Sequence, residues 1–274
     1  MKEISNSYFS NIAKYLDGYN FWEVYFENNP SKHSKLVNRL NKYVSASTEE
    51  DVEEIFHLLY SFVSKNYRND IIYKIEFLDV IEQFISDVNG SFIVNEFKFG
   101  RHRVDIAVFN GKSIAFEIKS DIDRANNIEE QFTLYPQVFD YCYLVTNEDR
   151  IEKFIDLISE NTGIILMDDK CNFSLHRKAR SNNELSYDQL FRILRKDEYL
   201  DIVQKFFQEI PSVPNTRIFN ECFDLLSEVD LNKFKQEFLK KIKSRNYSTK
   251  ISEILKYDKI FRQGYLANTR IMAN

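Results

Sequence analysis

Two short apolar segments joined by Asn110-Gly111 constrain the fold of this chain more than any other stretch. The segments RVDIAVFN (103–110) and KSIAFEIK (112–119) are rich in β-branched and aromatic residues, which favour strands. Asn-Gly is typical of the turn between two antiparallel strands. A similar segment, SFIVNEF (91–97), comes just before them. The pattern therefore predicts a three-stranded antiparallel meander.

Charged side chains interrupt two of these strands. Asp105, Glu117 and Lys119 lie in segments that otherwise resemble the interior of a sheet. A charge in such a place needs a partner or a metal ion to offset its desolvation. Glu117 and Lys119 are two residues apart, so their side chains share one face of the strand.

The loop between the two strands decides whether the carboxylates of Asp105 and Glu117 can meet. A two-residue turn at Asn110-Gly111 would pair Asp105 with Phe116 and place the two carboxylates on opposite faces. A three-residue loop, residues 109–111, would place them diagonally adjacent on one face, within reach of a common ion. We predict the three-residue loop, with Gly111 in the left-handed conformation.

The rest of the chain alternates between helical and strand patterns. Residues 1–70 and 71–89 have apolar residues at helical spacing, with Gly90 as the expected C-cap of the second helix. A polar stretch that begins another helix follows the meander, and Pro136 is expected to kink or end that helix. The later expected elements are strands at 141–146, 163–168 and 172–178, a helix at 147–161 with Asn147 as N-cap, and helices from about residue 181.

This order of elements predicts an α/β fold with a mixed central sheet and helical flanks. We divide the chain into a helical N-terminal region (1–70), a core (71–180) and a helical C-terminal region (181–274).

Composition narrows the kinds of site that this chain can hold. The chain has 274 residues with a formal net charge of −5, and its three cysteines and four histidines are scattered without zinc-site spacing. Any metal site would therefore be built from carboxylates, which favours magnesium, manganese or calcium. No segment has the pattern of a signal peptide or a membrane span, so we expect a cytoplasmic protein that does not bind membranes.

Two neighbouring carboxylates and a lysine suit one kind of chemistry. Carboxylates a few ångströms apart raise each other's pKa unless a cation lies between them. A magnesium ion held by Asp105 and Glu117 would relieve that repulsion and accept phosphate oxygens. Lys119 could orient or deprotonate the attacking water and stabilise the developing charge, which together amounts to metal-assisted hydrolysis of a phosphodiester. The alternative is a cross-strand salt bridge on a half-exposed sheet.

The pattern Asp105…Glu117-Ile118-Lys119 resembles the core of the PD-(D/E)XK nuclease superfamily, which includes restriction endonucleases and RecB-like nucleases. Gln131 and Tyr135 add the QxxxY pattern of the RecB-like branch. The form GR-x-R-x-DIAV, EIKSD and VFD also resembles a bacterial family of mostly uncharacterised proteins, and the resemblance covers roughly residues 90–200.

This resemblance implies a restriction-endonuclease-like core (αβββαβ) and a role for each matching residue. Asp105 and Glu117 would bind Mg2+ or Mn2+, with the carbonyl of Ile118 as a further ligand, and Lys119 would be catalytic. Glu96 matches an upstream acidic residue, and Glu82 on the preceding helix competes with it as the third carboxylate.

Several other residues have both a functional and an ordinary interpretation. Gln131 and Tyr135 would orient the lysine or contact phosphate, or they pack as a tyrosine with a polar neighbour. Arg101 and Arg103, with His102 between them, would contact the scissile phosphate or are solvated turn residues. The ordinary interpretation is favoured only for the pair Asp121 and Asp123, as N-caps of the next helix rather than outer metal ligands.

The leading hypothesis is a Mg2+-dependent nuclease that acts on DNA rather than RNA. Restriction or phage defence follows by resemblance only, as does a homodimer or a partner protein. One alternative is a nucleic-acid-binding or interaction module that keeps the nuclease fold without turnover. Another is a helical scaffold in which the hairpin is only structural.

Overall fold

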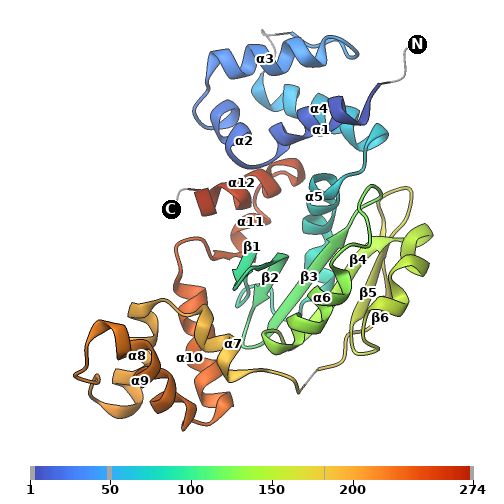
Figure 1. Cartoon of the computed structure of the whole chain (residues 1–274). Helices are drawn as coiled ribbons and strands as arrows, with labels where there is room; N and C mark the ends of the chain where they lie inside the picture. Colours follow the sequence, from blue (N-terminus) through green and yellow to red (C-terminus); the bar gives the residue numbers. More distant parts are fainter. Residues whose placement is uncertain (1–3, 48–50, 182, 272–274) are drawn as a thin grey trace.

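A mixed β-sheet lies at the centre of the computed structural model, which describes residues 4–47, 51–181 and 183–271. Within these residues the sheet has seven strands in the order β6-β5-β4-β3-β2-β1-β7. The strands are β1 (Phe92–Phe99), β2 (His102–Phe109), β3 (Ser113–Lys119), β4 (Tyr141–Asn147), β5 (Gly163–Met167), β6 (Phe173–Arg177) and β7 (Thr249–Lys250). The predicted mixed sheet with helical flanks is confirmed (Figure 1).

The sheet combines an antiparallel and a parallel half. Strands β1, β2 and β3 form the expected antiparallel meander. Strands β3, β4 and β5 are parallel, and β6 and β7 are antiparallel strands at the two edges. The strand that carries Glu117 and Lys119 therefore lies where the meander meets the parallel strands.

The hairpin loop has the predicted length but a different position. Phe109 pairs with Ser113, so the loop consists of Asn110, Gly111 and Lys112 rather than residues 109–111. Gly111 has a φ of +105°, which a residue with a side chain rarely adopts. The shift of one residue changes the register, because Asp105 now falls directly opposite Glu117 instead of diagonally.

Helices cover both faces of the sheet. On one face lies α5 (Asp70–Val80), whose Tyr73 and Phe77 pack with Ile106 and Phe116 of the meander. On the other face lie α6 (Ile128–Leu134), α7 (Tyr187–Ile193) and α10 (Leu231–Ser244). Helices α8 (Lys196–Phe207) and α9 (Asn215–Ser227) complete the C-terminal helical layer (Figure 1).

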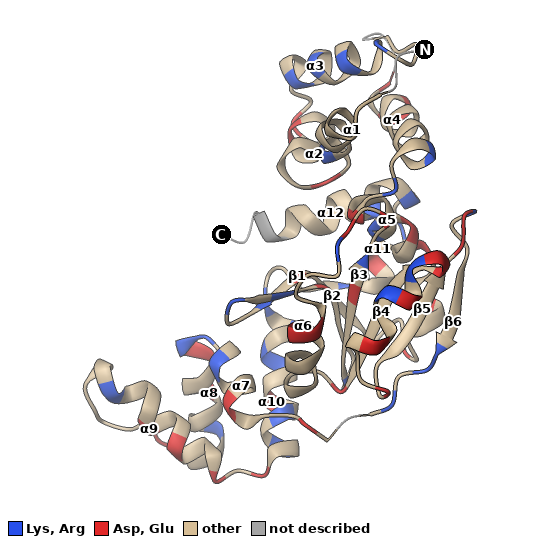
Figure 2. Cartoon of the chain, turned by 45° about the vertical axis from the view of Figure 1, so that its right-hand side comes forward, with Lys and Arg blue, Asp and Glu red and all other residues tan. Residues whose placement is uncertain are grey.

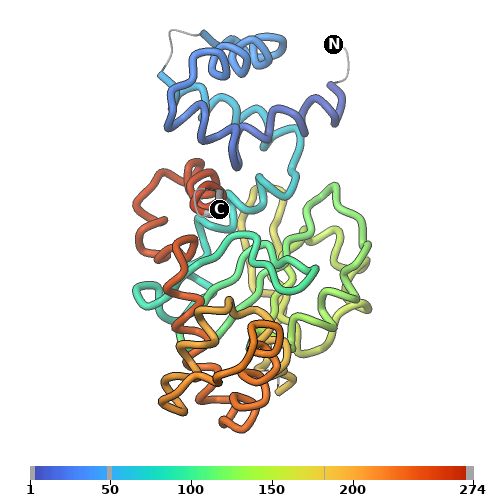
Figure 3. The backbone as a smooth tube through the Cα atoms, turned by 60° about the vertical axis from the view of Figure 1, so that its left-hand side comes forward, coloured from blue at the N-terminus to red at the C-terminus, as the bar shows by residue number. Residues whose placement is uncertain are grey.

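The N-terminal helices have a hydrophobic core of their own, which the far end of the chain completes. These helices are α1 (Asn6–Ala13), α2 (Gly18–Tyr25), α3 (Pro30–Leu40) and α4 (Val52–Asn66). Ile260 and Phe261 of α12 (Lys259–Ile271) belong to the same core. The short α11 (Ile251–Ile254) leads into α12, so the chain returns from the C-terminal layer to the N-terminal helices (Figures 1 and 3).

Two helical predictions need correction. Helix α5 ends at Val80 and is followed by a 3-10 turn, η2 (Ile81–Phe84), so Gly90 is not its C-cap. The backbone N–H of Gly90 instead donates to the carboxylate of Asp87, which closes a local turn.

The segment predicted as one helix at 147–161 forms two 3-10 stretches. These are η4 (Glu148–Lys153) and η5 (Ile155–Leu157). Asn147 caps the first stretch as expected, because its side chain accepts from the N–H of Asp149. The helix is interrupted at Phe154, which leaves helical geometry and is fully buried in the core.

None of the helices in the described ranges has both the length and the apolar character needed to cross a bilayer.

Candidate active site

Three carboxylates occupy neighbouring register positions on β1, β2 and β3. The flanking pairs Asn95–Ile106 and Phe97–Val104 place Glu96 opposite Asp105, but these two residues do not themselves pair. Glu96 has a φ of +55°, a left-handed conformation that is unusual for a residue with a side chain. The β1–β2 ladder is therefore interrupted at the position of the candidate metal ligand, and strained backbone of this kind clusters at functional sites.

The side chain of Asp105 accepts a hydrogen bond from β3 at the point where the backbone pairing of β2 and β3 ends. The last pair of this ladder is Ile106 with Phe116. Just beyond it, Asp105 Oδ2 accepts a hydrogen bond of 2.9 Å from the N–H of Ile118. The other oxygen, Oδ1, lies 3.0 Å from the ammonium of Lys74. The carboxylate is thus held between the end of the β2–β3 ladder and α5.

Glu117 lies at the centre of the network that the sequence predicted. Its side chain is buried, and Oε1 accepts from Lys119 Nζ at 2.7 Å and from Gln131 Nε2 at 2.6 Å. Its other oxygen accepts from the hydroxyl of Tyr135 at 2.6 Å. Lys119 also donates to Gln131 Oε1 at 3.0 Å. The structure therefore brings together four of the predicted site residues.

The QxxxY spacing explains how α6 reaches the site. Gln131 and Tyr135 are one helical turn apart, so they face the same way. Tyr135 begins a 3-10 turn, η3 (Tyr135–Gln137), and α6 stops there because Pro136 cannot continue it. The hydroxyl of Tyr135 also lies 3.0 Å from the carbonyl oxygen of Arg103, so the end of α6 and its following turn contact β2 as well as β3.

The electrostatics of Glu117 are those of a carboxylate that lacks a sufficient counterion. Burial and the neighbouring charge of Asp105 raise the pKa of Glu117 to about 7, against the lowering effect of Lys119. Burial and the charge of Glu117 also raise the pKa of Tyr135 well above its usual range. The site therefore contains the repulsion between carboxylates that a bound cation would relieve.

Lys74 is a member of this site that was not predicted from the sequence. It is buried on α5, and its ammonium contacts both Glu96 and Asp105. Burial alone would lower the pKa of Lys74, but Asp105, Glu96, Asp70 and Asp17 together raise it well above its usual value. One signal was present: Lys74 is the only basic residue in DIIYKIEFLDV (70–80), where helical spacing predicts burial.

A second residue that sequence analysis missed is Asp70, whose charge interacts with Lys74 and Asp105. It lies in the first turn of α5, where burial and the charges of Asp105 and Asp123 raise its pKa although Lys74 lowers it. Glu82, the helical residue proposed from the sequence, is exposed on η2. Glu96 is bound by Lys74 and, at 2.9 Å, by Arg103.

The basic residues before Asp105 point in different directions. Arg103 is ion-paired with Glu96 at the site. Arg101 is exposed and pairs with Glu130 of α6 at 2.6 Å, and His102 lies 3.8 Å from the same carboxylate. The acidic first turn of α6 is visible in Figure 2. We call Glu96, Asp105 and Glu117 the carboxylate row. Of the two predicted arginines, Arg103 is therefore the one that contacts a residue of this row.

Asp121 and Asp123 do not cap the next helix, since the N-cap of α6 is Asn127. Asp123 accepts from the N–H and hydroxyl of Ser120. Asp121 accepts from Arg68 and from the hydroxyl of Tyr73, both at 2.6 Å.

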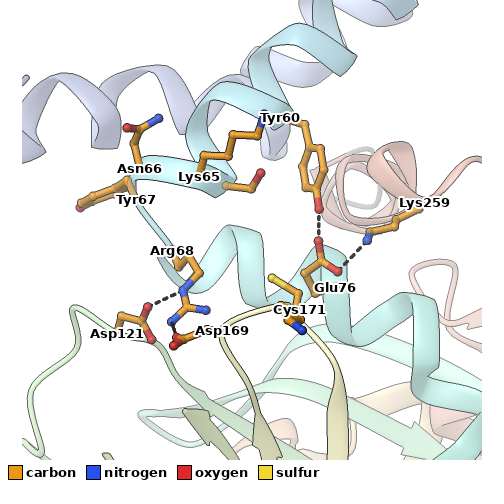
Figure 4. A pocket seen from close by; sticks show the side chains of 12 residues that line it. Tyr60, Lys65, Asn66, Tyr67, Arg68, Glu76, Asp121, Asp169, Cys171 and Lys259 are labelled. Atoms are coloured by element: carbon orange, nitrogen blue, oxygen red, sulfur yellow. Dashed lines mark hydrogen bonds and ion pairs between the residues drawn. The ribbon is translucent and has the colours of Figure 1, made fainter. Parts of the chain in front are cut away.

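Asp121 also lines a polar pocket of about 640 Å³ between α4, α5, α12 and the β5–β6 turn (Figure 4). In its wall, Arg68 bridges Asp121 and Asp169. Glu76 accepts from Tyr60 and from Lys259. Arg68 thus joins the segment between α4 and α5 to the strand ends, and Glu76 joins α5 to α4 and α12.

Comparison with known proteins places the chain in a family. The family model described as Bacteriophage P4 protein cII matches residues 63–264, from the end of α4 into α12. This chain belongs to the bacteriophage P4 cII family. Among curated proteins it is similar to Protein cII of Enterobacteria phage P4, with 24% identity over 163 residues. That alignment covers 57% of this chain and 60% of the length of that relative.

Among solved structures, the cII-family chain is similar to the SPO1766 protein of unknown function from Silicibacter pomeroyi. The two share 18% identity with a TM-score of 0.29, over 46% of this chain and 85% of that one. The family match includes every residue of the site described above except Asp17.

The possible metal ligands of this cII-family chain are carboxylate oxygens, the ligand type that hard divalent cations prefer. No group of three or more His, Cys, Asp or Glu side chains is placed to hold a metal ion among the residues that the structure describes. Asp105 and Glu117 lie opposite each other and interact electrostatically, and oxygen ligands of this type suit magnesium or manganese. An ion held by Asp105 would have to replace the ammonium of Lys74 on Oδ1.

Proposed function

We propose that this cII-family chain is a metal-dependent nuclease of the PD-(D/E)XK type, with a restriction-endonuclease-like core, that hydrolyses phosphodiester bonds in DNA. The observation that supports it is the convergence of Asp105, Glu117 and Lys119 with Gln131 and Tyr135. A simple salt bridge within β3 accounts for Glu117 and Lys119 alone. It does not account for two further donors that reach the same carboxylate from α6.

Each residue has a definite part in this proposal. A Mg2+ or Mn2+ ion held by Asp105, Glu117 and the carbonyl of Ile118 would supply Lewis acidity and a water of lowered pKa. Lys119 orients the attacking water and stabilises the charge that develops on the phosphate. Gln131 holds the ammonium of Lys119 in position, and Tyr135 fixes the second oxygen of Glu117.

Lysine substitution separates this proposal from a structural role. Supercoiled, linear and single-stranded DNA, and RNA, are incubated with Mg2+ or Mn2+ and with wild type, Lys119→Ala or Asp105→Asn. We expect wild type to cleave DNA and both variants to lose at least about 100-fold in rate, because the charge stabilisation or the metal ligand is gone.

The matched control is Lys112→Ala, which removes an exposed lysine from the same hairpin. Lys112 contacts Tyr141 and none of the site residues. Cleavage that persists in Lys119→Ala and Asp105→Asn at the wild-type rate would show that the activity does not come from this site. Restriction, phage defence and a homodimer or partner protein stay predictions from resemblance.

A second candidate function, a nucleic-acid-binding module without turnover, is favoured by one contact. The ammonium of Lys74 already neutralises Asp105 and Glu96. A site with a built-in cation can keep its structure without a metal ion. DNA binding that is unchanged by EDTA, together with no cleavage of any substrate in Mg2+ or Mn2+, would select this function.

A further inference from the structure

A second pocket opens beside the carboxylate row, on the side of β1. It has a volume of about 580 Å³, and we call it the β1 pocket. Its polar lining consists of Asp17 before α2, Asn95, Glu96 and Lys98 of β1, Arg103 of β2, Arg195 at the start of α8, and Tyr247 after α10. Glu96 and Arg103 also belong to the candidate active site, so a ligand in this pocket would lie next to the reacting groups.

Two cations of the β1 pocket form no salt bridge among the described residues, although the charge of Arg195 also acts on Glu198 in the first turn of α8. Lys98 and Arg195 are both exposed, and neither forms an ion pair within residues 4–47, 51–181 and 183–271. The guanidinium of Arg195 lies 5.6 Å from the centre of the Tyr247 ring. This contact places a cation and an aromatic face together, as in many sites that bind nucleotides.

The inner wall of the β1 pocket contains an acceptor without a donor. Asn95 is only 5% exposed, and its Oδ1 has no hydrogen-bond partner among the described residues. Buried acceptors are normally satisfied, so this wall is suited to a donor from water or from a ligand.

The pocket in Figure 4 contains ion pairs between different parts of the protein. Arg68 and Lys259 in its wall are already paired with Asp121, Asp169 and Glu76. Those contacts join parts of the protein to one another. Lys65 and Lys170, which also line the Figure 4 pocket, form no salt bridge among the described residues, so charge alone does not separate the two pockets. The β1 pocket shares Glu96 and Arg103 with the candidate active site and is therefore the better placed of the two for a substrate strand.

We propose that the β1 pocket binds one nucleotide of the substrate strand, next to the phosphodiester that is cleaved. Lys98 and Arg195 contact its phosphate, Tyr247 packs against its base, and the amide wall at Asn95 accepts from the base. The pocket thus favours a strand with an unpaired nucleotide at this position. This inference rests on the proposed nuclease function, but binding can be measured without cleavage.

Binding of a short labelled single-stranded DNA is measured by fluorescence anisotropy in EDTA, with the full chain carrying Lys119→Ala. Lys98→Ala and Arg195→Ala are added singly to this background. Each should raise Kd by about 3–30-fold and reduce the slope of log K against log salt by about one, because one phosphate contact is lost. The matched control is Arg192→Ala on α7, which pairs with Asp188 outside the pocket. It should leave Kd unchanged.

Competition then tests whether a whole nucleotide is bound. A deoxynucleoside monophosphate should displace the labelled strand at lower concentration than inorganic phosphate, and Tyr247→Ala should remove that difference. Thermal unfolding of each variant checks that the chain is folded. Because Lys98 is exposed, its substitution keeps the test valid even if Arg195→Ala disturbs α8.

The outcomes separate the two proposals. Unchanged Kd and salt slope in both Lys98→Ala and Arg195→Ala would overturn the β1 pocket, even if wild type cleaves DNA. Equal competition by phosphate and mononucleotide would reduce it to an anion site and overturn the nucleotide assignment. Binding that depends on both cations, in a chain that never cleaves, would support the pocket and contradict the nuclease.

Discussion

Glu117 has two opposing interactions. Lys119, Gln131 and Tyr135 all donate to its carboxylate, yet burial and Asp105 favour its protonated form. In a nuclease this conflict is useful, because a metal ion is the group that would resolve it. In the absence of metal, the conflict should be visible in the stability of the protein.

We predict that metal-free protein loses stability as pH rises from about 4.5 to about 7. The folded pKa of Glu117 is about 7 and the unfolded one is near 4.5, so the folded state binds more protons in this window. The loss from this residue should be about 3 kcal/mol in the free energy of unfolding, measured by urea denaturation at several pH values.

Substitution assigns this pH dependence to one residue. Glu117→Gln should remove the decline between pH 4.5 and 7, whereas Glu152→Gln, on the exposed side of η4, should retain it. Saturating Mg2+ should also flatten the wild-type profile. An identical decline in Glu117→Gln would mean that other groups cause it.

At the scale of elements, α5 completes what the meander begins. Strands β1 to β3 align three acidic residues. The cation that contacts two of them, Lys74, comes from α5, on the face of the sheet opposite to α6. Lys74 touches two of these carboxylates and also interacts with Asp17 at the start of α2. One helix thus joins the sheet and the N-terminal region electrostatically.

We predict that Lys74→Met destabilises the metal-free protein by about 3–5 kcal/mol, because the partly buried carboxylates of Glu96 and Asp105 would lose a buried cation. Adding Mg2+ should restore more stability to this variant than to wild type, since the ion would occupy the vacated position. Lys65→Met, at an exposed position on α4, is the control and should change stability by less than about 0.5 kcal/mol. Thermal melts with and without Mg2+ would contradict the proposal if Lys74→Met gained no more than wild type.

At the scale of the whole molecule, the two ends of the chain pack together. Helix α12 contacts α2 and α5, and its glycine Gly264 lies against the ring of Phe21. A Cβ at this position would come within 2.5 Å of that ring. The N-terminal helices and the C-terminal helix therefore form one packed unit above the sheet (Figure 3).

We predict that Gly264→Ala destabilises the protein by about 1–3 kcal/mol through overpacking. In an exposed helix the same change would stabilise by about 1 kcal/mol, so the sign of the effect tests the packing. Gly264→Ala should cost less free energy of unfolding in the Phe21→Leu background than in wild type, because the smaller side chain leaves room for the added methyl group. A double-mutant cycle in urea measures this difference. An increase in stability for Gly264→Ala would show that α12 does not pack this closely.

Strands β1 to β6, the length of the hairpin loop and the shared face of Asp105 and Glu117 could be predicted from the sequence, whereas β7 lies in the region predicted to be helical. These features depend on local periodicity and on the conformation that Gly111 permits, so short stretches suffice to predict them. The spacing of Gln131 and Tyr135 also placed both on one face of α6.

The distant charges near the site could not be predicted from the sequence. Lys74, Asp70, Asp17 and Arg195 come from helices and helix starts whose docking depends on packing between residues far apart in the sequence. Periodicity shows that a helix has a buried face, but it does not show which strand lies beneath it. The counterion of Asp105 and the walls of the β1 pocket therefore depend on how the helices dock, which local sequence patterns do not predict.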